Sequence, residues 1–356
     1  MMPFLTENFG NPSAIHTIGR RVRSAVEKAR KSMAKLIHAS TAEIFFTSSA
    51  TEANNTVLCC AVRDLGVKHI ITSPIEHHCI LHTAEQLEKE GLIQHHLIKV
   101  DCYGKVDIES LKSLIANIGE EKILVSIMHA NNEIGTLNDI AVIGTICKEN
   151  NVLFHSDTVQ TFAHFPINTQ ELNIDFLVGS AHKFHGPKGI GFLYISGDTS
   201  IKPLIFGGAQ ERNMRAGTEN VPGIIGMAKA AELAYGNLEK DKEYISNLKQ
   251  TMKQKLQQNF EGLSFNGDPD GNSLYTVLSV SFPPHPKNSM LLINLDISGV
   301  CASGGSACSS GVDVGSHVLT CLGMDTERAN VRFSFSKFNT VEEIDIVIGK
   351  LKEILS

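Results

Sequence analysis

The sequence lacks the patterns that place a protein in or across a membrane. No apolar run approaches the roughly 20 residues that a membrane-spanning helix needs. Residues 1–7 do not combine a basic stretch with a following apolar one, as a signal peptide does. We therefore expect a cytoplasmic protein that has no membrane partner.

The sequence also lacks an excess of positive charge. Its formal net charge is −6, from 32 basic and 38 acidic side chains. Nucleic acids and anionic membrane surfaces attract positively charged patches, so this balance argues against both kinds of partner. No internal repeat and no low-complexity tract is present. We expect no direct contact with nucleic acid.

The cysteines lack the spacing of a metal site. None forms a C-x-x-C pair and none has zinc-like spacing, so no metal site is expected. The even count would also allow four disulfides, but a chain of this length without an export signal is typical of a reducing compartment. The eight positions are Cys59, Cys60, Cys79, Cys102, Cys147, Cys301, Cys308 and Cys321.

What is present is the composition of a globular protein. The 356 residues are 42% hydrophobic and 20% charged, which suits a sizeable core and about two domains. Short β-rich runs alternate with longer helical stretches, which predicts an α/β fold with a largely parallel sheet. The expected strands are 43–47, 68–73, 95–100, 122–128, 151–155, 174–179 and 190–195. Helices are expected between most of them, including 13–36, a helix from about 52, 107–117 and 139–149.

The pattern changes near residue 238. A long amphipathic helix follows, with apolar residues from Ile245 to Leu256 at helical spacing. Beyond it we expect, in order, a strand at 274–282, a helix at 289–298, a strand at 331–337 and a helix from 341. Thr340 and Glu343 have capping-box spacing at the start of that last helix. The sequence thus predicts a large domain over 1–238 and a smaller α+β domain over 239–356.

One cysteine, Cys308, has unusual neighbours. It lies within a glycine- and serine-rich segment at 303–311, whereas buried structural cysteines usually sit among bulky apolar side chains. Glycine gives this backbone conformational freedom. The segment therefore indicates an exposed thiol that reaches toward another group.

A hydroxyl-rich segment and a glycine-rich segment each follow a predicted strand. Residues 47–54 open a helix and contain Ala50 and Thr51; they suit either an ordinary capping box from Ser49 to Glu52 or an anion site at the helix start. Residues 180–191 place Lys183 just past a strand and before a glycine-rich turn. That lysine is either a solvated side chain or an amine that forms a Schiff base with a carbonyl compound.

Three further segments carry chemistry-bearing residues. Asp157 follows a predicted strand. There it would form a turn, cap a helix or bind the ring nitrogen of a cofactor. His77 precedes a second histidine; it would stack on an aromatic cofactor and move protons, or lie in a solvated loop. Arg332 alternates with the core residues Val331 and Phe333, so it lies on the opposite face among serines. Arg332 would bind a carboxylate through two hydrogen bonds or form a surface salt bridge.

In their order along the chain, these segments resemble a cysteine desulfurase of the class V aminotransferase group, whose members are fold-type I pyridoxal phosphate enzymes. The resemblance covers nearly the whole chain from Gly10 onward. The motifs are A-T-E at 50–52, E-H-H at 76–78, N-N-E-I-G at 131–135, S-D-T-V-Q at 156–160, S-A-H-K-F-H-G-P-K-G-I-G at 180–191, R-A-G-T-E-N-V-P-G at 215–223 and S-G-G-S-A-C-S-S-G at 303–311.

The resemblance implies a role for each matching residue. Lys183 would hold pyridoxal 5′-phosphate covalently, and His77 would stack on its ring and transfer protons. Cys308 would accept sulfur as the nucleophile, and it would be the residue to ligate an iron–sulfur cluster transiently. The other implied roles are Asp157 at the ring nitrogen, Gln160 at the phenolic oxygen, Thr51, Ser180 and His182 at the phosphate, Thr218 at the phosphate of a second subunit, and Asn132 and Arg332 at the substrate carboxylate. Ala50 and Asn132 would also lie beside the cofactor.

The implied reaction converts L-cysteine to L-alanine and leaves a persulfide on Cys308. The implied partners are a second copy of the chain and a sulfur acceptor such as an iron–sulfur cluster scaffold. Selenocysteine lysis or another pyridoxal phosphate-dependent β-elimination is the alternative within enzymes, and a non-catalytic sulfur-relay subunit is the alternative outside them. The long cysteine segment is similar to that of members that supply such scaffolds.

The sequence departs from the family pattern in two places. The family begins with a further segment that contains an A-T-T-P-like motif, whereas this sequence starts just before Gly10-Asn11-Pro12. If that segment is absent from the protein, we expect impaired substrate closure and activity with the fold retained. The stretch between Cys308 and Arg332 is also slightly short, which would alter loop packing there.

Overall fold

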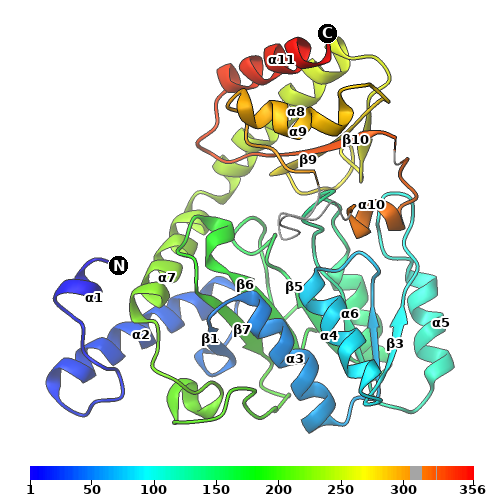
Figure 1. Ribbon diagram of the computed structural model, residues 1–356. Coiled ribbons are helices and arrows are strands. Elements are labelled where there is room, and N and C mark those ends of the chain that lie inside the picture. Colours follow the sequence, from blue (N-terminus) through cyan, green and yellow to red (C-terminus); the bar gives the residue numbers. More distant parts are fainter. Residues whose placement is uncertain (305–314, 326) are drawn as a thin grey trace. The chain divides into compact units, whose positions relative to one another are not determined.

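The computed structural model describes residues 1–304, 315–325 and 327–356. The described chain divides into two compact units (Figure 1). The first comprises residues 1–99, 107–129 and 139–238, and the second comprises residues 100–106, 130–138 and 239–356. Two short segments of the first half of the chain thus cluster with its C-terminal part. The assignment of 1–238 and 239–356 to two domains stays a prediction.

A seven-stranded sheet forms the centre of the first unit. The strand order is β1-β7-β6-β5-β4-β2-β3, and every strand except β7 runs in the same direction. The expected α/β fold with a mostly parallel seven-stranded sheet is confirmed. The strands are β1 (Ile44–Thr47), β2 (His69–Thr72), β3 (Gln94–Leu97), β4 (Ile123–Ser126), β5 (Leu153–Asp157), β6 (Phe176–Ser180) and β7 (Gly191–Ile195).

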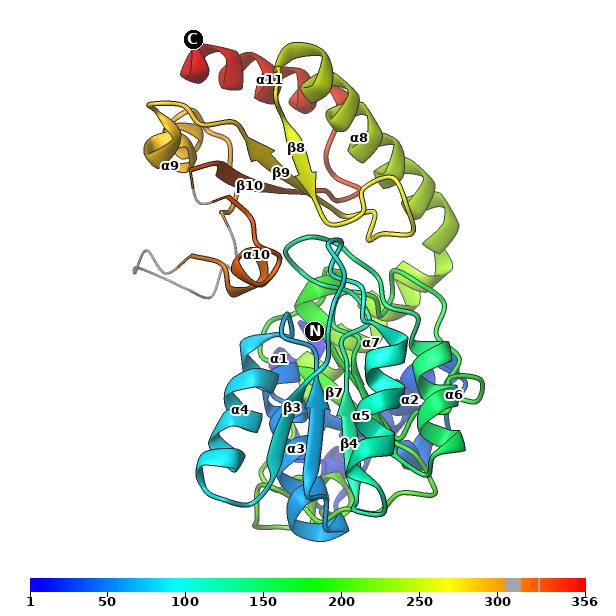
Figure 2. The same cartoon turned by 90° about the vertical axis from the view of Figure 1, so that its right-hand side faces the viewer.

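Helices cover both faces of this sheet. Figure 2 shows α3 and α4 on one side and α5 and α6 on the other. This explains why β2, β4 and β6 are buried at every position, as the continuous apolar runs predicted. The helices of this unit are α1 (Pro3–Thr6), α2 (Thr17–Leu36), α3 (Ala50–Leu65), α4 (His78–Lys89), α5 (Ile108–Ile118), α6 (Ile140–Glu149) and α7 (Val221–Gly236), with short 3₁₀ turns η1 (Thr41–Glu43), η2 (Ala181–Phe184) and η3 (Gln210–Asn213).

One strand boundary differs from the prediction in a way that matters for the site. The fifth strand was expected at 151–155, but β5 runs from Leu153 to Asp157. Asn151 adopts a left-handed φ of 54°, and the N–H of Val152 bonds the carbonyl of Cys147 in α6. Residues 151 and 152 therefore terminate the helix. As a result, Asp157 is the last residue of the strand.

The second unit contains a three-stranded antiparallel sheet of order β10-β9-β8. Its helices and strands enclose a separate apolar core that includes Leu248, Val280, Phe333 and Ile348. The predicted capping box at Thr340 and Glu343 is present. The elements are α8 (Leu238–Asn259), β8 (Ser264–Asn266), β9 (Val277–Phe282), η4 (Asn288–Met290), α9 (Leu291–Ile297), α10 (His317–Cys321), β10 (Ala329–Ser334) and α11 (Val341–Leu355).

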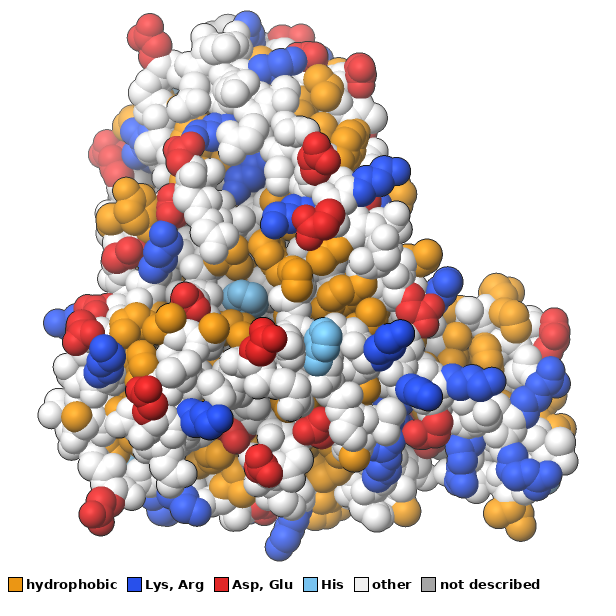
Figure 3. Space-filling model, turned by 180° about the vertical axis from the view of Figure 1, so that it is seen from behind, with side chains coloured by type: hydrophobic (Ala, Val, Ile, Leu, Met, Phe, Trp, Pro, Cys, Tyr) orange, Lys and Arg blue, Asp and Glu red, His pale blue; other side chains and the backbone are white. Residues whose placement is uncertain are grey.

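The surface carries no large segregation of charge on the face seen in Figure 3. Acidic and basic side chains both occur across this face, with apolar side chains among them. Within the described residues, no helix is both long and apolar enough to cross a bilayer. The seven cysteines in the described part of the chain have free thiols.

Candidate functional site

The residues expected to bind the cofactor follow the carboxyl ends of the strands of the large sheet. His77 follows β2, Asp157 ends β5 and Lys183 follows β6. Ala50 and Thr51 open α3 directly after β1. Because these four strands run in the same direction, their carboxyl ends meet at one edge of the sheet, where α/β folds bind ligands. These residues lie far apart in the sequence, and the strand order brings them to one edge of the sheet.

Asp157 is the most deeply held of these groups. Its side chain is 7% exposed, and its two oxygens accept hydrogen bonds from different donors. The Nδ2 atom of Asn54 lies 2.8 Å from Oδ2, and the backbone N–H of Val159 lies 2.9 Å from Oδ1. Two donors stabilise the ionised carboxylate. Asp157 is therefore suited to hold a protonated ring nitrogen in place.

His77 caps the start of α4. Its Nδ1 accepts a hydrogen bond from the backbone N–H of Cys79 at 3.1 Å. The same nitrogen lies 3.0 Å from the Sγ of Cys79. A backbone N–H always donates, so the neutral ring carries its proton on Nε2.

The start of α3 has the geometry of an anion site. The first N–H groups of a helix have no partner within the helix, and the positive end of the helix dipole lies there. Gly191 allows β7 to pass close to this turn, since a Cβ at that position would lie 2.8 Å from the carbonyl carbon of Ser49. Residues 49–51 are thus packed against the strand that follows Lys183.

The predicted capping box at this helix start is only half formed. The hydroxyl of Ser49 accepts from the N–H of Glu52, as expected. The carboxylate of Glu52 accepts from the N–H of Ser48 instead of Ser49, and it also pairs with Arg215 at 2.9 Å. Arg215 precedes Thr218 by three positions. Glu52 therefore joins the helix start to the loop that carries Thr218.

The segment after β6 carries the lysine and two expected phosphate ligands. Ser180 is 2% exposed, and its hydroxyl lies 2.9 Å from the Nδ1 of His182. Burial, together with the charges of Lys183 and Lys188, lowers the pKa of His182. Lys183 itself is exposed, within the 3₁₀ turn η2. Gln160 lies three residues beyond Asp157 and is half-buried.

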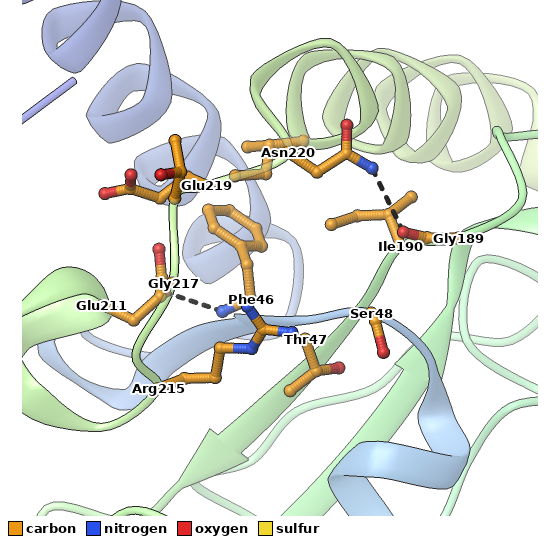
Figure 4. Close-up of a pocket in the computed structure, with 12 residues that line it drawn as sticks. Phe46, Thr47, Ser48, Gly189, Ile190, Glu211, Arg215, Gly217, Glu219 and Asn220 are labelled. Atoms are coloured by element: carbon orange, nitrogen blue, oxygen red, sulfur yellow. Dashed lines mark hydrogen bonds between the residues drawn. The ribbon is translucent and has the colours of Figure 1, made fainter. Parts of the chain in front are cut away.

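Thr218 lines a separate pocket of about 180 Å³ within the first unit (Figure 4). The loop of Arg215, Gly217 and Glu219 forms one side of it, and Thr47 and Ser48 at the end of β1 form another. Asn220 fixes the far end of the loop, with Nδ2 3.1 Å from the carbonyl oxygen of Gly189.

The two residues expected at the substrate carboxylate contact each other within the second unit. The Nη1 of Arg332 donates to the carbonyl oxygen of Asn132 at 3.0 Å. Arg332 also lines a small pocket with Glu133, Ser279 and Asn330. Val331 and Phe333, its neighbours in β10, are buried in the core, as the alternating pattern predicted.

Cys308 lies outside the described residues, and so do its neighbours at 305–314. The described residues on either side are anchored within the second unit. Ser303 exchanges two backbone hydrogen bonds with Arg332. Ser316, the N-cap of α10, donates from its hydroxyl to the carboxylate of Glu133. Ser303 thus lies beside Arg332, and Ser316 lies beside Glu133, the neighbour of Asn132 in the sequence.

Sequence reasoning missed three residues that hold the site together: Asn54, Glu76 and Cys79. The carboxyl of Glu76 accepts from the hydroxyl of Ser73 at 2.6 Å and from the N–H of Met128. The pKa of Glu76 is raised to about 8, chiefly by burial and also by the charge of Asp157, although the hydrogen bonds from Ser73 and Met128 act in the opposite direction. In the sequence, only the position of Glu76 next to His77 indicated that Glu76 belongs to the site.

This donor set suits pyridoxal phosphate. The buried carboxylate of Asp157 is a partner for a cationic ring nitrogen. The start of α3, together with Ser180 and His182, offers hydrogen-bond donors to a phosphate. Lys183 supplies an amine from the neighbouring turn. The residues at this edge of the sheet thus match the charged parts of the cofactor.

Comparison with known proteins identifies the family. The model of the family described as aminotransferase class-V matches residues 1–347. A relative named cysteine desulfurase IscS from Dictyoglomus turgidum is 44% identical over 359 residues, which cover all of this chain and 90% of that protein. A protein of the same name from Methanosarcina thermophila is also 44% identical and covers all of this chain and 87% of that one.

Solved structures agree with this result. A NifS-like protein superposes with a TM-score of 0.91 at 38% identity, covering 99% of this chain and 93% of its own. A structure described as SspA in complex with cysteine superposes with a TM-score of 0.82 at 31% identity, covering 95% and 94%. The family match and the NifS-like neighbours confirm the expected fold class, a fold-type I pyridoxal phosphate enzyme.

Proposed function

This chain belongs to the class-V aminotransferase family, and on that premise we propose that it is a pyridoxal phosphate-dependent cysteine desulfurase. It converts L-cysteine to L-alanine and transfers the sulfur to one of its own cysteines. The observation that carries this proposal is the gathering of His77, Asp157 and Lys183 at one edge of the sheet. The chain supplies both the cofactor residues and a cysteine in a glycine-serine segment.

Each cofactor residue would have its own role. Lys183 would hold the cofactor covalently, Asp157 would bind the ring nitrogen and Gln160 the phenolic oxygen. Thr51, Ser180 and His182 would bind the phosphate, with Ala50 beside the cofactor. Bound pyridoxal phosphate withdraws electrons from the substrate and so weakens the bonds at its α- and β-carbons.

Proton transfer falls to His77 and Lys183. The geometry of His77 favours exchange at Nε2, because Nδ1 already accepts from the N–H of Cys79. The amine of Lys183 would take or return the α-proton of the substrate. Asn132 and Arg332 bind the substrate carboxylate and orient the molecule.

The sulfur moves by nucleophilic attack. The Cys308 thiolate attacks the sulfur of the substrate, a sulfur–sulfur bond forms and the carbon–sulfur bond breaks. The carbon keeps the bonding electron pair and takes up a proton, which gives alanine. Cys308 then carries a persulfide that a second thiol can attack. The acceptor is an iron–sulfur cluster scaffold or another sulfur-transfer protein, and the protein works in the cytoplasm.

A homodimer completes the phosphate site. Thr218 lies in its own pocket with Ser48 and Arg215, and we propose that it reaches the phosphate bound to the partner subunit. The proposal rests on the match of Arg215-Ala216-Gly217-Thr218 to the family motif, and the ion pair of Glu52 with Arg215 holds the loop of Thr218 against α3. Each subunit would then stabilise both phosphate sites.

A complementation experiment tests the lysine and the dimer together. Lys183→Ala alone should lack the absorbance band of bound cofactor and release no alanine from cysteine. Lys183→Ala and Thr218→Ala subunits, tagged differently, should form a heterodimer that is more active than either homodimer. One of its two sites would contain both an intact lysine and an intact threonine.

The heterodimer of Lys183→Ala with a wild-type subunit serves as the control, because it also has one intact site. If Thr218 acts within its own subunit, the mixed heterodimer will only reach the mean activity of its two parents. An unchanged absorbance band in Lys183→Ala would refute the role of the lysine.

A further inference from the structure

Cys79 lies at the centre of a hydrogen-bonded chain beside the site. It is on the first turn of α4, two residues after His77. Its Sγ lies 3.0 Å from the Nδ1 of His77. On the other side, the Nδ2 of Asn54 lies 3.2 Å from the same sulfur. The thiol therefore contacts a predicted catalytic ring and a buried amide at once.

Asn54 extends this chain to the cofactor carboxylate. It is fully buried in α3, and its Nδ2 also donates to Asp157 at 2.8 Å. A carboxylate only accepts hydrogen bonds, so the amide nitrogen must face Asp157. Both amide hydrogens are then in use, one toward Asp157 and one toward Cys79. Three separate elements, β5, α3 and α4, are joined by this single line of contacts.

The direction of the remaining bond follows. Because the sulfur of Cys79 accepts from Asn54, its own hydrogen is available for the Nδ1 of His77. That nitrogen already accepts from the backbone N–H of Cys79. The thiol and the backbone thus present two donors to the same ring nitrogen. This arrangement holds the ring in one orientation and in the tautomer that carries its proton on Nε2.

The thiol of Cys79 stays protonated at neutral pH. The pKa of Cys79 is raised to about 12, chiefly by burial and also by the charge of Asp157, while the hydrogen bond from Asn54 acts in the opposite direction. A thiolate at this position would have no hydrogen to donate and would be a competing nucleophile. The environment of Cys79 therefore suits a hydrogen-bond donor and not a sulfur acceptor.

We propose that Cys79 is a positioning residue that fixes the orientation and tautomer of His77 and couples it, through Asn54, to Asp157. The inference rests on the catalytic roles proposed above for His77 and Asp157. Through this chain the residue at the ring nitrogen and the residue that moves protons form one connected unit. Loss of the thiol would leave both residues present but His77 less precisely held.

Two substitutions in the cofactor-loaded dimer test this role. Cys79→Ala should keep the cofactor absorbance band and the KM for cysteine, while kcat for alanine formation falls about 10-fold, as for removal of a supporting hydrogen bond to an active-site ligand. Cys79→Ser keeps a donor at the same place and should recover most of kcat. Sulfur should still accumulate on Cys308 alone in both variants.

Cys147→Ala is the matched control. Cys147 is also a buried thiol in the first unit, on α6, and burial raises its pKa to about 12 as well. This variant should lose a comparable amount of packing and leave kcat unchanged. Equal kcat in Cys79→Ala and Cys147→Ala would overturn the inference, as would a Cys79→Ser variant no more active than Cys79→Ala.

His77→Ala separates this inference from the proposed function. Full activity of His77→Ala would overturn the role of His77 and the positioning role together. An inactive His77→Ala beside a Cys79→Ala with wild-type kcat would overturn only the role of Cys79.

Discussion

At the scale of single residues, the site depends on buried groups whose charge is set by their surroundings. The carboxylate of Asp157 accepts hydrogen bonds from Asn54 and Val159. The carboxyl of Glu76 has its pKa raised to about 8, chiefly by burial. It is therefore held largely protonated at neutral pH.

Glu76 gives stability a dependence on pH. The folded protein holds this proton more tightly than the unfolded chain, where the pKa is near its ordinary value of 4.5. Stability from the protonated carboxyl is therefore complete below about pH 4.5 and lost as the pH rises through about 8. Because each pKa unit corresponds to about 1.4 kcal/mol, the loss in unfolding free energy is on the order of a few kcal/mol. Glu76→Gln should remove this loss.

Urea unfolding at pH 5 and pH 8 measures this effect. The difference between the two midpoints should shrink in Glu76→Gln. Glu109→Gln, on the exposed surface of α5, should show the same difference as the unchanged protein. If the two variants behave alike, the carboxyl of Glu76 does not bind its proton in the way inferred.

The sequence could predict which residues carry the chemistry but not which residues support them. Asp157 and Lys183 follow strands, so their common edge followed once the sheet was known to be parallel. The contacts of Asn54 with Asp157 and Cys79 join residues 103 and 25 positions apart. No local pattern encodes such contacts, because they arise only when α3, α4 and β5 pack together.

At the scale of elements, the outer edge of β1 is closed by an ion pair. The guanidinium of Arg30 in α2 binds both oxygens of Glu211, at 2.7 and 2.8 Å. The same pair provides hydrogen-bond partners for backbone groups at the open edge of β1, since Arg30 donates to the carbonyl of Ile44 and Glu211 accepts from the N–H of Phe46. These bonds also hold Glu211 at a φ of 43°, where side chains other than glycine are uncommon.

Removing this charge should be costly. Glu211→Gln leaves Arg30, which is 2% exposed, without its buried counter-charge, and breaking such a pair costs about 3–5 kcal/mol in unfolding free energy. Glu27→Gln removes the other partner of Arg30, which is 47% exposed, and should cost at most about 1 kcal/mol. Urea unfolding of both variants gives the comparison. Equal losses would mean that burial does not set the strength of this pair.

Element boundaries were harder to predict than element types. The seven strands of the large sheet were expected from their apolar runs, and the capping box of α11 was read from Thr340 and Glu343. The start of β5 was placed two residues early, because residues 151 and 152 end α6. The left-handed φ of Asn151 and the bond from Val152 to Cys147 set that boundary, whereas side-chain propensity alone favoured an earlier one.

At the scale of the whole molecule, the two compact units carry different parts of the proposed reaction. His77, Asp157 and Lys183 belong to the first unit, whereas Asn132 and Arg332 belong to the second. The order of the motifs along the chain was enough to indicate the family, which the comparisons then established. The sequence could not show that residues 130–138 would cluster with the C-terminal part, since that depends on pairing such as Thr136 with Ser273.

The central claim is that Cys308 accepts sulfur from cysteine while the cofactor residues make its release possible. The most direct measurement incubates the protein with L-cysteine, quantifies alanine and determines the mass of the peptide that contains Cys308. We predict alanine together with additional sulfur on that peptide, and a Cys308→Ala variant that keeps the cofactor absorbance but forms no alanine. Alanine formed by Cys308→Ala at the normal rate, or additional sulfur found only on another cysteine, would contradict the claim.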